Sequence, residues 1–335
     1  MPTSPHALDL ATFQAARERL DGRIVRTPVA HLRSGVVAPA GGVDERGVVT
    51  TPAVDERLPG DVWLKLECLQ VTGSFKARGA LNRVLSLAPD QARRGIVTAS
   101  GGNHGLAVAY AGRAIGAPTT VYLPRLTPEA KAKRIARWGA EVIRAGEVWD
   151  DAHAAALAHA ERDGLTYVHP FADPEVVAGQ GTIALEVFEQ APETDALVIA
   201  IGGGGLMAGV GAAARLLRPG IRVIGVEPVG APTLHASLAA DRLIELPSIA
   251  TAAGTLAPRR SDPYTFELVR AVADTIVLVT DDEMRDAARY LLDNAGVGVE
   301  LSGAAALAAL LTGKAPLAGA TRPCALVCGA GTDGR

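Results

Sequence analysis

Short apolar runs alternate along the chain with longer stretches in which apolar residues recur every three or four positions. The short runs have the length and the Val, Ile and Leu content of buried strands, and the longer stretches have the period of helices. This alternation is typical of an α/β protein with parallel strands. The predicted strands are Val62–Leu66, Gly95–Thr98, Thr119–Leu123, Glu141–Arg144, Ala196–Ile201, Arg222–Val226, Thr275–Val279 and Ala325–Cys328.

Two of the predicted helices have readable starts. Thr127 is placed to cap a helix whose first position is Pro128, and the next residue is acidic. Thr280 precedes three acidic residues, and the helix that it opens is predicted to run to about Asn294. Acidic residues in a first turn favour the helix because its N-terminus carries a partial positive charge.

The order of the elements predicts two domains, each with helices on both sides of a mainly parallel, twisted sheet. Residues 93–167 form the smaller domain, which the chain enters and leaves once. Residues 1–92 and 168–335 form the larger one. Within the larger domain, residues 34–60 are rich in Gly, Pro, Val and charge without a lasting period, so we interpret them as a surface insertion.

Composition and charge exclude several classes of partner. The chain has 335 residues, of which 48% are hydrophobic and only 4% aromatic, so small aliphatic side chains must build most of the core. A net charge of −3 gives no electrostatic reason to expect nucleic acid or an anionic membrane as partner. No stretch of about 18 residues is free of charges and helix breakers, so we expect no membrane span.

Cysteine usage and the first residues of the chain indicate a cytoplasmic protein. Cys68, Cys324 and Cys328 form no Cys-x-x-Cys pair and no disulfide framework. Cys324 and Cys328 lie in an apolar run, where a buried thiol is expected. Residues 1–10 lack the basic and apolar pattern of a secretory signal.

Four consecutive glycines, Gly202 to Gly205, follow the predicted strand Ala196–Ile201 and precede a helical pattern. A strand, a glycine turn and a helix start together make a site for an anion, because N–H groups and the helix dipole point to it. No Gly-Lys-Ser/Thr follows, so this is not a P-loop. A dinucleotide site remains open as Gly203-x-Gly205-x-x-Ala208, although four glycines suit a phosphate monoester better.

Lys76 is predicted to lie just inside a helix start, where the helix dipole disfavours a cation. Such a lysine is either a flexible surface residue or an amine that is kept neutral for chemistry. Burial lowers the pKa of an amine, and the neutral form makes Schiff bases. Taken alone, Lys76 fits a surface lysine better than a reactive amine. The choice between the two interpretations depends on the residues around it in the fold.

Two further turns follow predicted strands. In Ser100-Gly101-Gly102-Asn103-His104, backbone N–H groups are placed to bind a carboxylate, and Asn103 is placed to donate to a phenolate oxygen. For His104 itself, a packed or capping imidazole is the better interpretation. The other turn is Cys328-Gly329-Ala330-Gly331-Thr332-Asp333, which by itself fits an ordinary chain end.

These segments together resemble one family. The run from Leu64 to Ala80, with Ser74-Phe75-Lys76, resembles the Schiff-base segment of threonine/serine dehydratases, which are fold type II (tryptophan-synthase-β-like) pyridoxal-phosphate enzymes. Residues 100–104 resemble the substrate-carboxylate loop of that family, and residues 202–206 its phosphate cup. Thr182 and the run Glu300-Leu301-Ser302-Gly303 also match. The resemblance extends from about Arg26 to Asp333.

The resemblance implies a set of roles. Pyridoxal 5'-phosphate is the expected cofactor, in the cleft between the two domains, with Lys76 as its anchor and as the base for the α-proton. Phe75 flanks the ring, Asn103 bonds its 3-hydroxyl oxygen, and Cys328 faces the pyridine nitrogen. The backbone of Gly202, Gly203, Gly204, Gly205 and Leu206 holds the phosphate, and Ser100, Gly101, Gly102, Asn103 and His104 bind the substrate. The implied reaction is β-elimination from L-threonine or L-serine to a 2-oxo acid and ammonia, in a homodimer.

The sequence also departs from the family. Related serine racemases carry a second serine at the position of Gly101, which has no side chain to act on the opposite face of Cα. Relatives that bind a cation often have an Asp where this chain has Thr233, so Glu227 and Ala231 are weak metal candidates and no metal is expected. A racemase, a dehydratase for a modified hydroxy amino acid and a noncatalytic nucleotide-binding protein remain the alternatives.

Overall fold

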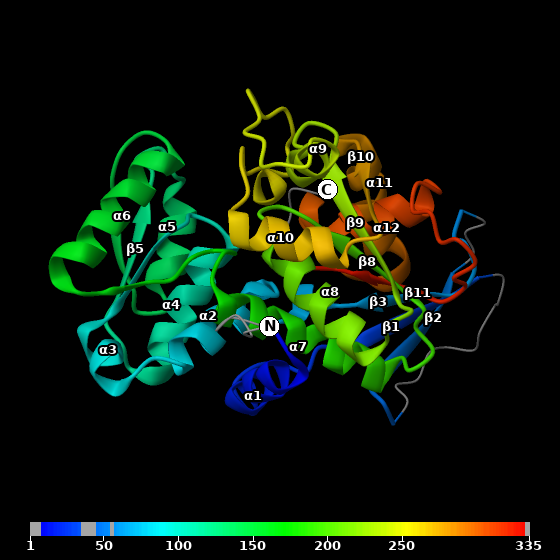
Figure 1. Cartoon of the computed structure of the whole chain (residues 1–335), viewed down its shortest axis with the longest axis horizontal. Helices are drawn as coiled ribbons and strands as arrows, with labels where there is room; N and C mark the ends of the chain where they lie inside the picture. Colours follow the sequence, from blue (N-terminus) through cyan, green and yellow to red (C-terminus); the bar gives the residue numbers. More distant parts are fainter. Residues whose placement is uncertain (1–7, 35–44, 54–56, 332–335) are drawn as a thin grey trace.

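The computed structural model describes residues 8–34, 45–53 and 57–331 of the chain. These residues form two β-sheets, each with helices on both of its faces (Figure 1). The smaller sheet and its helices lie on the left of Figure 1, in cyan and green, and the larger sheet lies on the right. The predicted α/β architecture with mainly parallel strands is confirmed. No helix in the described part of the chain is long and apolar enough to cross a membrane.

The larger sheet is built from β1 (Val29–Ser34), β2 (Val48–Ala53), β3 (Val62–Lys65), β8 (Ala196–Ala200), β9 (Arg222–Pro228), β10 (Thr275–Val279) and β11 (Pro323–Leu326). Their order across the sheet is β10-β9-β8-β11-β3-β1-β2. All neighbours are parallel except β1 and β3, which are antiparallel. Parallel sheets require cover on both faces, and β3, β8 and β11 are buried at every position.

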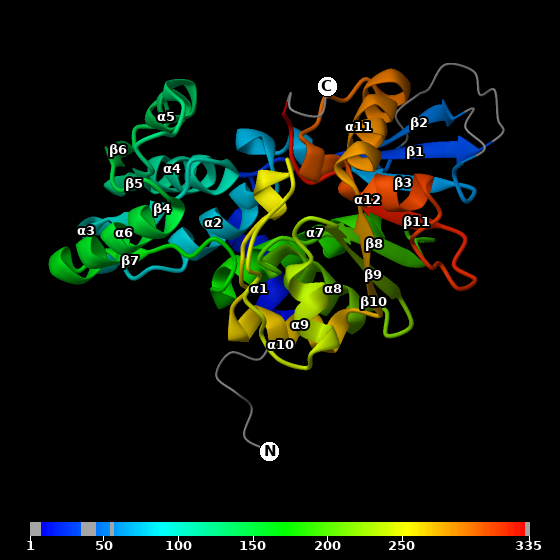
Figure 2. The ribbon, with the colours of Figure 1, turned by 90° about the horizontal axis from the view of Figure 1, so that it is seen from above.

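Helices cover both faces of the larger sheet. Figure 2 shows α11 (Asp281–Ala295) and α12 (Leu301–Leu311) on one side and α7 (Pro174–Gln190) and α8 (Gly205–Leu217) on the other. Every residue of α12 is buried, and its alanines let the helix approach β8, β9, β10 and β11. The remaining elements of this part are α1 (Leu10–Leu20), the 3₁₀ turns η1 (Glu67–Leu69), η2 (Val71–Gly73) and η3 (Gly254–Leu256), α9 (Thr233–Ala239) and α10 (Pro263–Val272).

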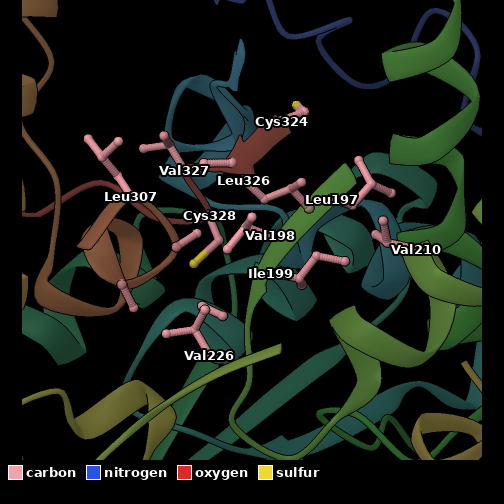
Figure 3. Close-up of a cluster of buried hydrophobic side chains, with 14 of the residues drawn as sticks. Leu197, Val198, Ile199, Val210, Val226, Leu307, Cys324, Leu326, Val327 and Cys328 are labelled. Atoms are coloured by element: carbon pink, nitrogen blue, oxygen red, sulfur yellow. The ribbon is translucent and has the colours of Figure 1, made fainter. Parts of the chain in front are cut away.

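Small aliphatic side chains fill the core, as the composition predicted. Figure 3 shows part of it, where Leu197, Val198 and Ile199 of β8 pack beside Leu326 and Val327. These five residues are at most 1% exposed. Burying such side chains contributes roughly 1.5–3 kcal/mol each, before the cost of ordering the chain.

The smaller sheet is built from β4 (Ile96–Ala99), β5 (Thr119–Leu123), β6 (Glu141–Arg144) and β7 (Thr166–Tyr167), in the order β6-β5-β4-β7 and all parallel. Alternate residues of its strands face opposite sides. Val121 and Leu123 pack against α4 (Asn103–Ile115) and α5 (Glu129–Ala136), whereas Val97 and Tyr122 pack against α6 (Trp149–Asp163). Helices α2 (Lys76–Leu85) and α3 (Pro89–Arg94) precede the first strand.

The predicted strands are all present, with ends displaced by at most two residues. The helix that was predicted to start with Pro128 starts instead at Glu129, and Pro128 is its N-cap. The sequence missed β1, β2 and the two-residue strand β7. The segment 34–60 is more than a surface insertion, because it contains β2, which pairs with β1 at the edge of the larger sheet. Residues 35–44 and 54–56 of this segment lie outside the described residues.

Helix α2 stands between the two sheets. Ala80, Leu81 and Val84 of α2 share a buried cluster with Ile96 of β4 and Val108 of α4. The same helix also contacts α7, which covers the larger sheet. The domain boundary predicted after residue 92 stays a prediction. Helix α2, which precedes this boundary, packs against elements of both sheets.

Candidate active site

Lys76 is the first residue of α2, as the sequence predicted, and the turn before it is held by the end of the chain. The backbone N–H of Phe75 donates to the carbonyl oxygen of Cys328 at 3.2 Å, and Ser74 forms a β-bridge with Gly329. Thr72, in the turn η2, has a φ of 69°, a value that residues other than glycine rarely adopt. Such backbone strain persists only where the surrounding structure fixes the conformation.

The amine of Lys76 is held by the backbone, and the residue is partly buried. Its Nζ donates a hydrogen bond to the carbonyl oxygen of Pro170 at 2.6 Å and lies 5.1 Å from the centre of the Phe75 ring. Burial lowers the pKa of Lys76 to about 8, although Cys328 and Glu300 oppose the shift. The structure therefore favours the neutral-amine interpretation over a surface lysine.

This low pKa gives a prediction for the cofactor-free protein. We expect the acetylation rate of Lys76 by acetic anhydride to rise with pH and to reach half of its maximum near pH 8. Only the neutral amine is a nucleophile, and its fraction grows as the pH passes the pKa, which is about 10.4 for an ordinary lysine. Peptide mass spectrometry measures the rate at this site. A half-maximum above pH 10 would contradict the neutral-amine interpretation.

The four glycines form a turn between β8 and α8 that lies against Phe171. A Cβ on Gly203 would lie 2.3 Å from the Phe171 ring, and one on Gly205 would lie 2.8 Å from the Phe171 carbonyl oxygen. Gly204 has a φ of 95°. Gly205 and Leu206 begin α8, where N–H groups have no carbonyl partner within the helix. Phe171 follows Pro170, the partner of Lys76, so the amine and the glycine turn face one region.

A methyl group at Gly203 tests how closely this turn must pack. We expect Gly203→Ala to weaken binding of pyridoxal phosphate by about tenfold or more, because the ring of Phe171 has to shift. Quenching of tryptophan fluorescence as the cofactor is titrated into the cofactor-free protein gives the affinity. Gly220→Ala is the matched control, since nothing lies within 4 Å of its Cβ position. Equal affinities for the two variants would refute this role of the turn.

The loop Ser100–His104 leads from β4 into α4, which Asn103 begins. Ser100 Oγ accepts the N–H of Gly102 at 3.3 Å. The His104 imidazole is 4% exposed, its Nε2 contacts the Val168 carbonyl oxygen at 3.0 Å, and burial lowers the pKa of His104 to about 3. His104 is thus a packed, neutral group, which is the interpretation that the sequence favoured.

Cys328 lies just beyond β11, at the edge of the core shown in Figure 3. Its Sγ donates to the carbonyl oxygen of Ser302 at 3.3 Å. Burial raises the pKa of the Cys328 thiol far above its ordinary value, so the group is neutral. All three cysteines in the described residues are free and buried, as predicted for Cys324 and Cys328.

Comparison with known proteins decides the family. The model of a family described as "pyridoxal-phosphate dependent enzyme" matches residues 44–329. The chain belongs to this family.

Its relatives support the assignment over nearly the whole chain. L-threonine ammonia-lyase of Thermotoga maritima is 40% identical over 80% of this chain and 67% of that protein. Phenylserine dehydratase of Ralstonia pickettii is 40% identical over 85% of this chain and 89% of that protein. The solved structure of maize serine racemase superposes with a TM-score of 0.87 at 31% identity, covering 98% of this chain and 94% of the other.

Three features of this pyridoxal-phosphate enzyme fit the cofactor. The Lys76 amine has the low pKa that condensation with an aldehyde requires. The glycine turn at the start of α8 offers unpaired N–H groups to a phosphate. The neutral thiol of Cys328 suits an uncharged aromatic nitrogen. The Lys76 amine and the glycine turn meet at Pro170 and Phe171, and the Cys328 thiol lies close enough to influence the Lys76 amine.

Glu300 is a site residue that carried no predicted role. Its Oε1 accepts hydrogen bonds from Asn103 Nδ2 at 2.9 Å, Ser302 Oγ at 2.6 Å and Thr255 Oγ1 at 3.2 Å. A Cβ on Gly329 would lie 2.5 Å from this oxygen, which explains a glycine after Cys328. Glu300 thereby fixes Asn103 from across the interface between the two sheets. Its position before α12 was visible in the sequence, but its partner 197 residues away was not.

A buried ionic cluster holds α2 in place. The guanidinium of Arg78, which is 0% exposed, donates two hydrogen bonds to Glu67 and two to Glu186, at 2.7–2.8 Å. Lys65 Nζ donates to Glu186 at 2.6 Å and to Gln190 at 2.8 Å. The positive charges of Lys65 and Arg78 equal in number the negative charges of the two glutamates, so the cluster has no net charge. Arg78 follows Lys76 by two residues, so this cluster anchors the turn of helix that carries the reactive amine.

The weak metal candidates lie apart from these groups. The carboxylate oxygens of Glu227 accept the N–H groups of Leu234 and His235, each at 2.8 Å, at the start of α9. Burial raises the pKa of Glu227 to about 8. Ala231 is fully buried. Among the described residues, no group of three or more His, Cys, Asp or Glu side chains is arranged to hold a metal ion.

Proposed function

We propose that the protein is an ammonia-lyase that converts a β-hydroxy amino acid such as L-threonine or L-serine to a 2-oxo acid and ammonia. The observation that carries the proposal is the position of the Lys76 amine, which donates to the carbonyl oxygen of Pro170, directly before the Phe171 that packs on the glycine turn. The identity to L-threonine ammonia-lyase of Thermotoga maritima supports this reaction among those of the family.

The roles of the residues follow from their positions. Lys76 anchors the cofactor and accepts the α-proton, and the N–H groups of Gly202 to Leu206 hold the phosphate. Asn103, fixed by Glu300, donates to the 3-hydroxyl oxygen, and Phe75 flanks the ring. Pyridoxal phosphate, when bound, supplies an aldehyde for the amine and withdraws electrons from Cα. The backbone of residues 100–104, at the N-terminus of α4, receives the substrate carboxylate.

Proton transfer then leads to loss of water. As Lys76 takes the α-proton, the electron pair of the Cα–H bond forms a Cα–Cβ double bond and the Cβ–O pair leaves with the hydroxyl, which is protonated to water. Hydrolysis of the resulting enamine consumes one water and releases ammonia, so the net loss is ammonia alone. The neutral Cys328 thiol offers no charge to hold a proton on the pyridine nitrogen, which favours elimination over transamination.

A racemase of the same fold is the alternative, and the maize enzyme supports it. Racemisation needs a second acid/base group on the opposite face of Cα. Gly101 offers none, and a Cβ there would lie 3.1 Å from Thr127 Cγ2. A dehydratase for a modified hydroxy amino acid is a further alternative, which the identity to phenylserine dehydratase supports.

One incubation separates these functions. The cofactor-loaded protein is mixed with L-serine or L-threonine, and the 2-oxo acid, ammonia and both enantiomers of the amino acid are measured over time. We expect equal amounts of 2-oxo acid and ammonia and no D-amino acid. Accumulation of D-serine with little pyruvate would overturn the lyase proposal in favour of the racemase.

We also propose a cytoplasmic homodimer with residues 93–167 as its small domain. Free buried thiols suit a reducing compartment, and two-fold dimers are the commonest symmetric assembly. A net charge of −3 gives no electrostatic attraction for nucleic acid, so we propose no nucleic-acid partner. Light scattering of the purified protein measures the assembly, and a monomer mass would refute the dimer.

A further inference from the structure

Five aromatic rings form a continuous line through the smaller part of the molecule. We call Trp149, His153, Tyr167, His169 and Phe171 the ring ladder. The ring centres of Trp149 and His153 are 4.7 Å apart with nearly parallel planes, and those of His153 and Tyr167 are 5.3 Å apart. The line continues over 6.2 Å to His169 and over 4.7 Å to Phe171, both with ring edges towards ring faces. These are favourable aromatic geometries.

The sequence explains why the rings align. Trp149 and His153 are four residues apart on α6, so they lie on one face of the helix. Tyr167 ends β7 and His169 follows it by two residues, while the chain bends at residues 170–171, which brings the N–H of Phe171 to His169 Nδ1. In a chain that is only 4% aromatic, this concentration is unusual.

The ring ladder lies at the boundary between the core and the surface. Trp149 is 41% exposed, and the other four rings are partly exposed. Side chains that only stabilise the fold by packing are usually fully buried, as the aliphatic core of the larger sheet is. Rings that stay partly exposed can contact a ligand.

Both ends of the ring ladder meet the proposed active site. Trp149 Nε1 donates to the carbonyl oxygen of Ala99 at 2.9 Å, directly before the loop that begins with Ser100. At the other end, Phe171 lies over the glycine turn and follows Pro170, which holds Lys76. A substrate with its carboxylate at the Ser100 loop and its Cα at Lys76 would therefore have one end of the ring ladder near its carboxylate and the other near Lys76.

The ring ladder is uncharged. His169 Nδ1 accepts the backbone N–H groups of Phe171 and Ala172, at 3.2 and 2.7 Å, which fixes a neutral imidazole. His153 Nδ1 lies 2.7 Å from the Tyr167 hydroxyl, which is placed to donate to it. Burial lowers the pKa of His153, and it lowers the pKa of His169 to about 4. An acidic substituent would find no cation among these five rings.

We propose that the ring ladder binds the β-substituent of the substrate and that the enzyme prefers β-hydroxy amino acids whose β-substituent is an uncharged aromatic ring. The proposal rests on the ammonia-lyase function and adds the substrate class and the residues that select it. Stacking and edge contacts between rings add an attraction beyond the burial of area, which is expected to favour an aromatic substituent by about three- to tenfold. An aliphatic substituent of the same size would gain only the free energy of burying its apolar area.

The first experiment compares substrates on the cofactor-loaded enzyme. We expect kcat/KM for L-threo-phenylserine to exceed the values for L-threonine, 3-hydroxyleucine and 3-hydroxyaspartate, with 2-oxo acid formation as the readout. The second experiment measures binding without elimination. L-Phenylalanine and L-2-aminobutyrate have no β-hydroxyl to lose, and calorimetry is expected to show tighter binding of L-phenylalanine.

Substitutions in the ring ladder test which residues select the substrate. Trp149→Ala and His153→Ala are each expected to lower the ratio of kcat/KM for L-threo-phenylserine to that for L-threonine by about three- to tenfold. His159→Ala is the matched control. His159 also lies on α6 and pairs with a tyrosine hydroxyl, that of Tyr122, but it is outside the ring ladder. We expect its selectivity to equal that of the wild type.

The outcomes separate this proposal from the proposed function. An enzyme that forms no 2-oxo acid from any of the four substrates overturns the lyase function. Turnover of L-threonine with a selectivity ratio that Trp149→Ala and His153→Ala leave unchanged overturns the ring-ladder proposal alone. Equal losses for both substrates would likewise refute it, since they would indicate a structural role. A stronger preference for 3-hydroxyleucine than for phenylserine would refute the aromatic preference.

Discussion

Replacing Lys76 with alanine is expected to reduce 2-oxo acid formation by about a thousandfold or more, because one amine anchors the cofactor and moves the α-proton. The loss should come without loss of fold, since the side chain makes one hydrogen bond, to Pro170, at a cost of desolvation. Borohydride reduction of the loaded protein, followed by peptide mapping, should place the cofactor on Lys76 in the wild type and on no residue in the variant.

Two further variants make this result interpretable. Lys133→Ala removes an exposed lysine of α5 and should leave activity and labelling unchanged. Lys76→Arg keeps a cation at the site but cannot supply a neutral amine, so it should be as inactive as Lys76→Ala. Full covalent labelling of Lys76→Ala would mean that another amine anchors the cofactor and would refute the assignment.

Replacing Arg78 with methionine is expected to lower the free energy of unfolding by about 3–5 kcal/mol. The substitution leaves the carboxylates of Glu67 and Glu186 buried with one partner fewer, and an uncompensated buried charge is costly. Denaturant titration followed by circular dichroism measures the change, for variant and wild type under the same conditions. The cofactor-free protein is used so that ligand binding does not contribute.

The charge balance of the buried cluster supplies the controls. Adding Glu67→Gln to Arg78→Met removes the carboxylate that is left without a cation and keeps the Lys65–Glu186 pair, so it should recover part of the lost stability. Arg285→Met breaks an exposed pair with Asp282 and should cost about 1 kcal/mol or less. If Arg78→Met cost no more than Arg285→Met, the cluster would not anchor α2.

Local patterns predicted much of the fold and the reactive groups. The strands with continuous Val, Ile and Leu runs were all found, because burial on both faces leaves a clear signal. The glycine turn and Lys76 were found because each lies where a helix begins. Edge strand β2 was missed because it contains Pro52, a residue that argues against a strand except at a sheet edge.

Contacts between segments that are far apart in the sequence could not be predicted from local sequence patterns. Asn103 and Glu300 bond across 197 residues, and Arg78 and Glu186 across 108. Nothing near Arg78 in the sequence distinguishes it from an exposed arginine. The ring ladder was missed for the same reason, since helical spacing places two of its rings on α6 and the other three lie on β7 and the segment that follows it. Only the folded chain brings those two sets together.

Helix α12 limits how this protein can be altered by design. Ala304, Ala305 and Ala308 are 0% exposed and let the helix lie close to the sheet. Larger side chains there would have to push the helix away, at roughly 1–3 kcal/mol each. Because Glu300 directly precedes this helix, any displacement would also reach Asn103. Efforts to raise thermal tolerance by filling the interior should therefore avoid this face and begin at the outer helices.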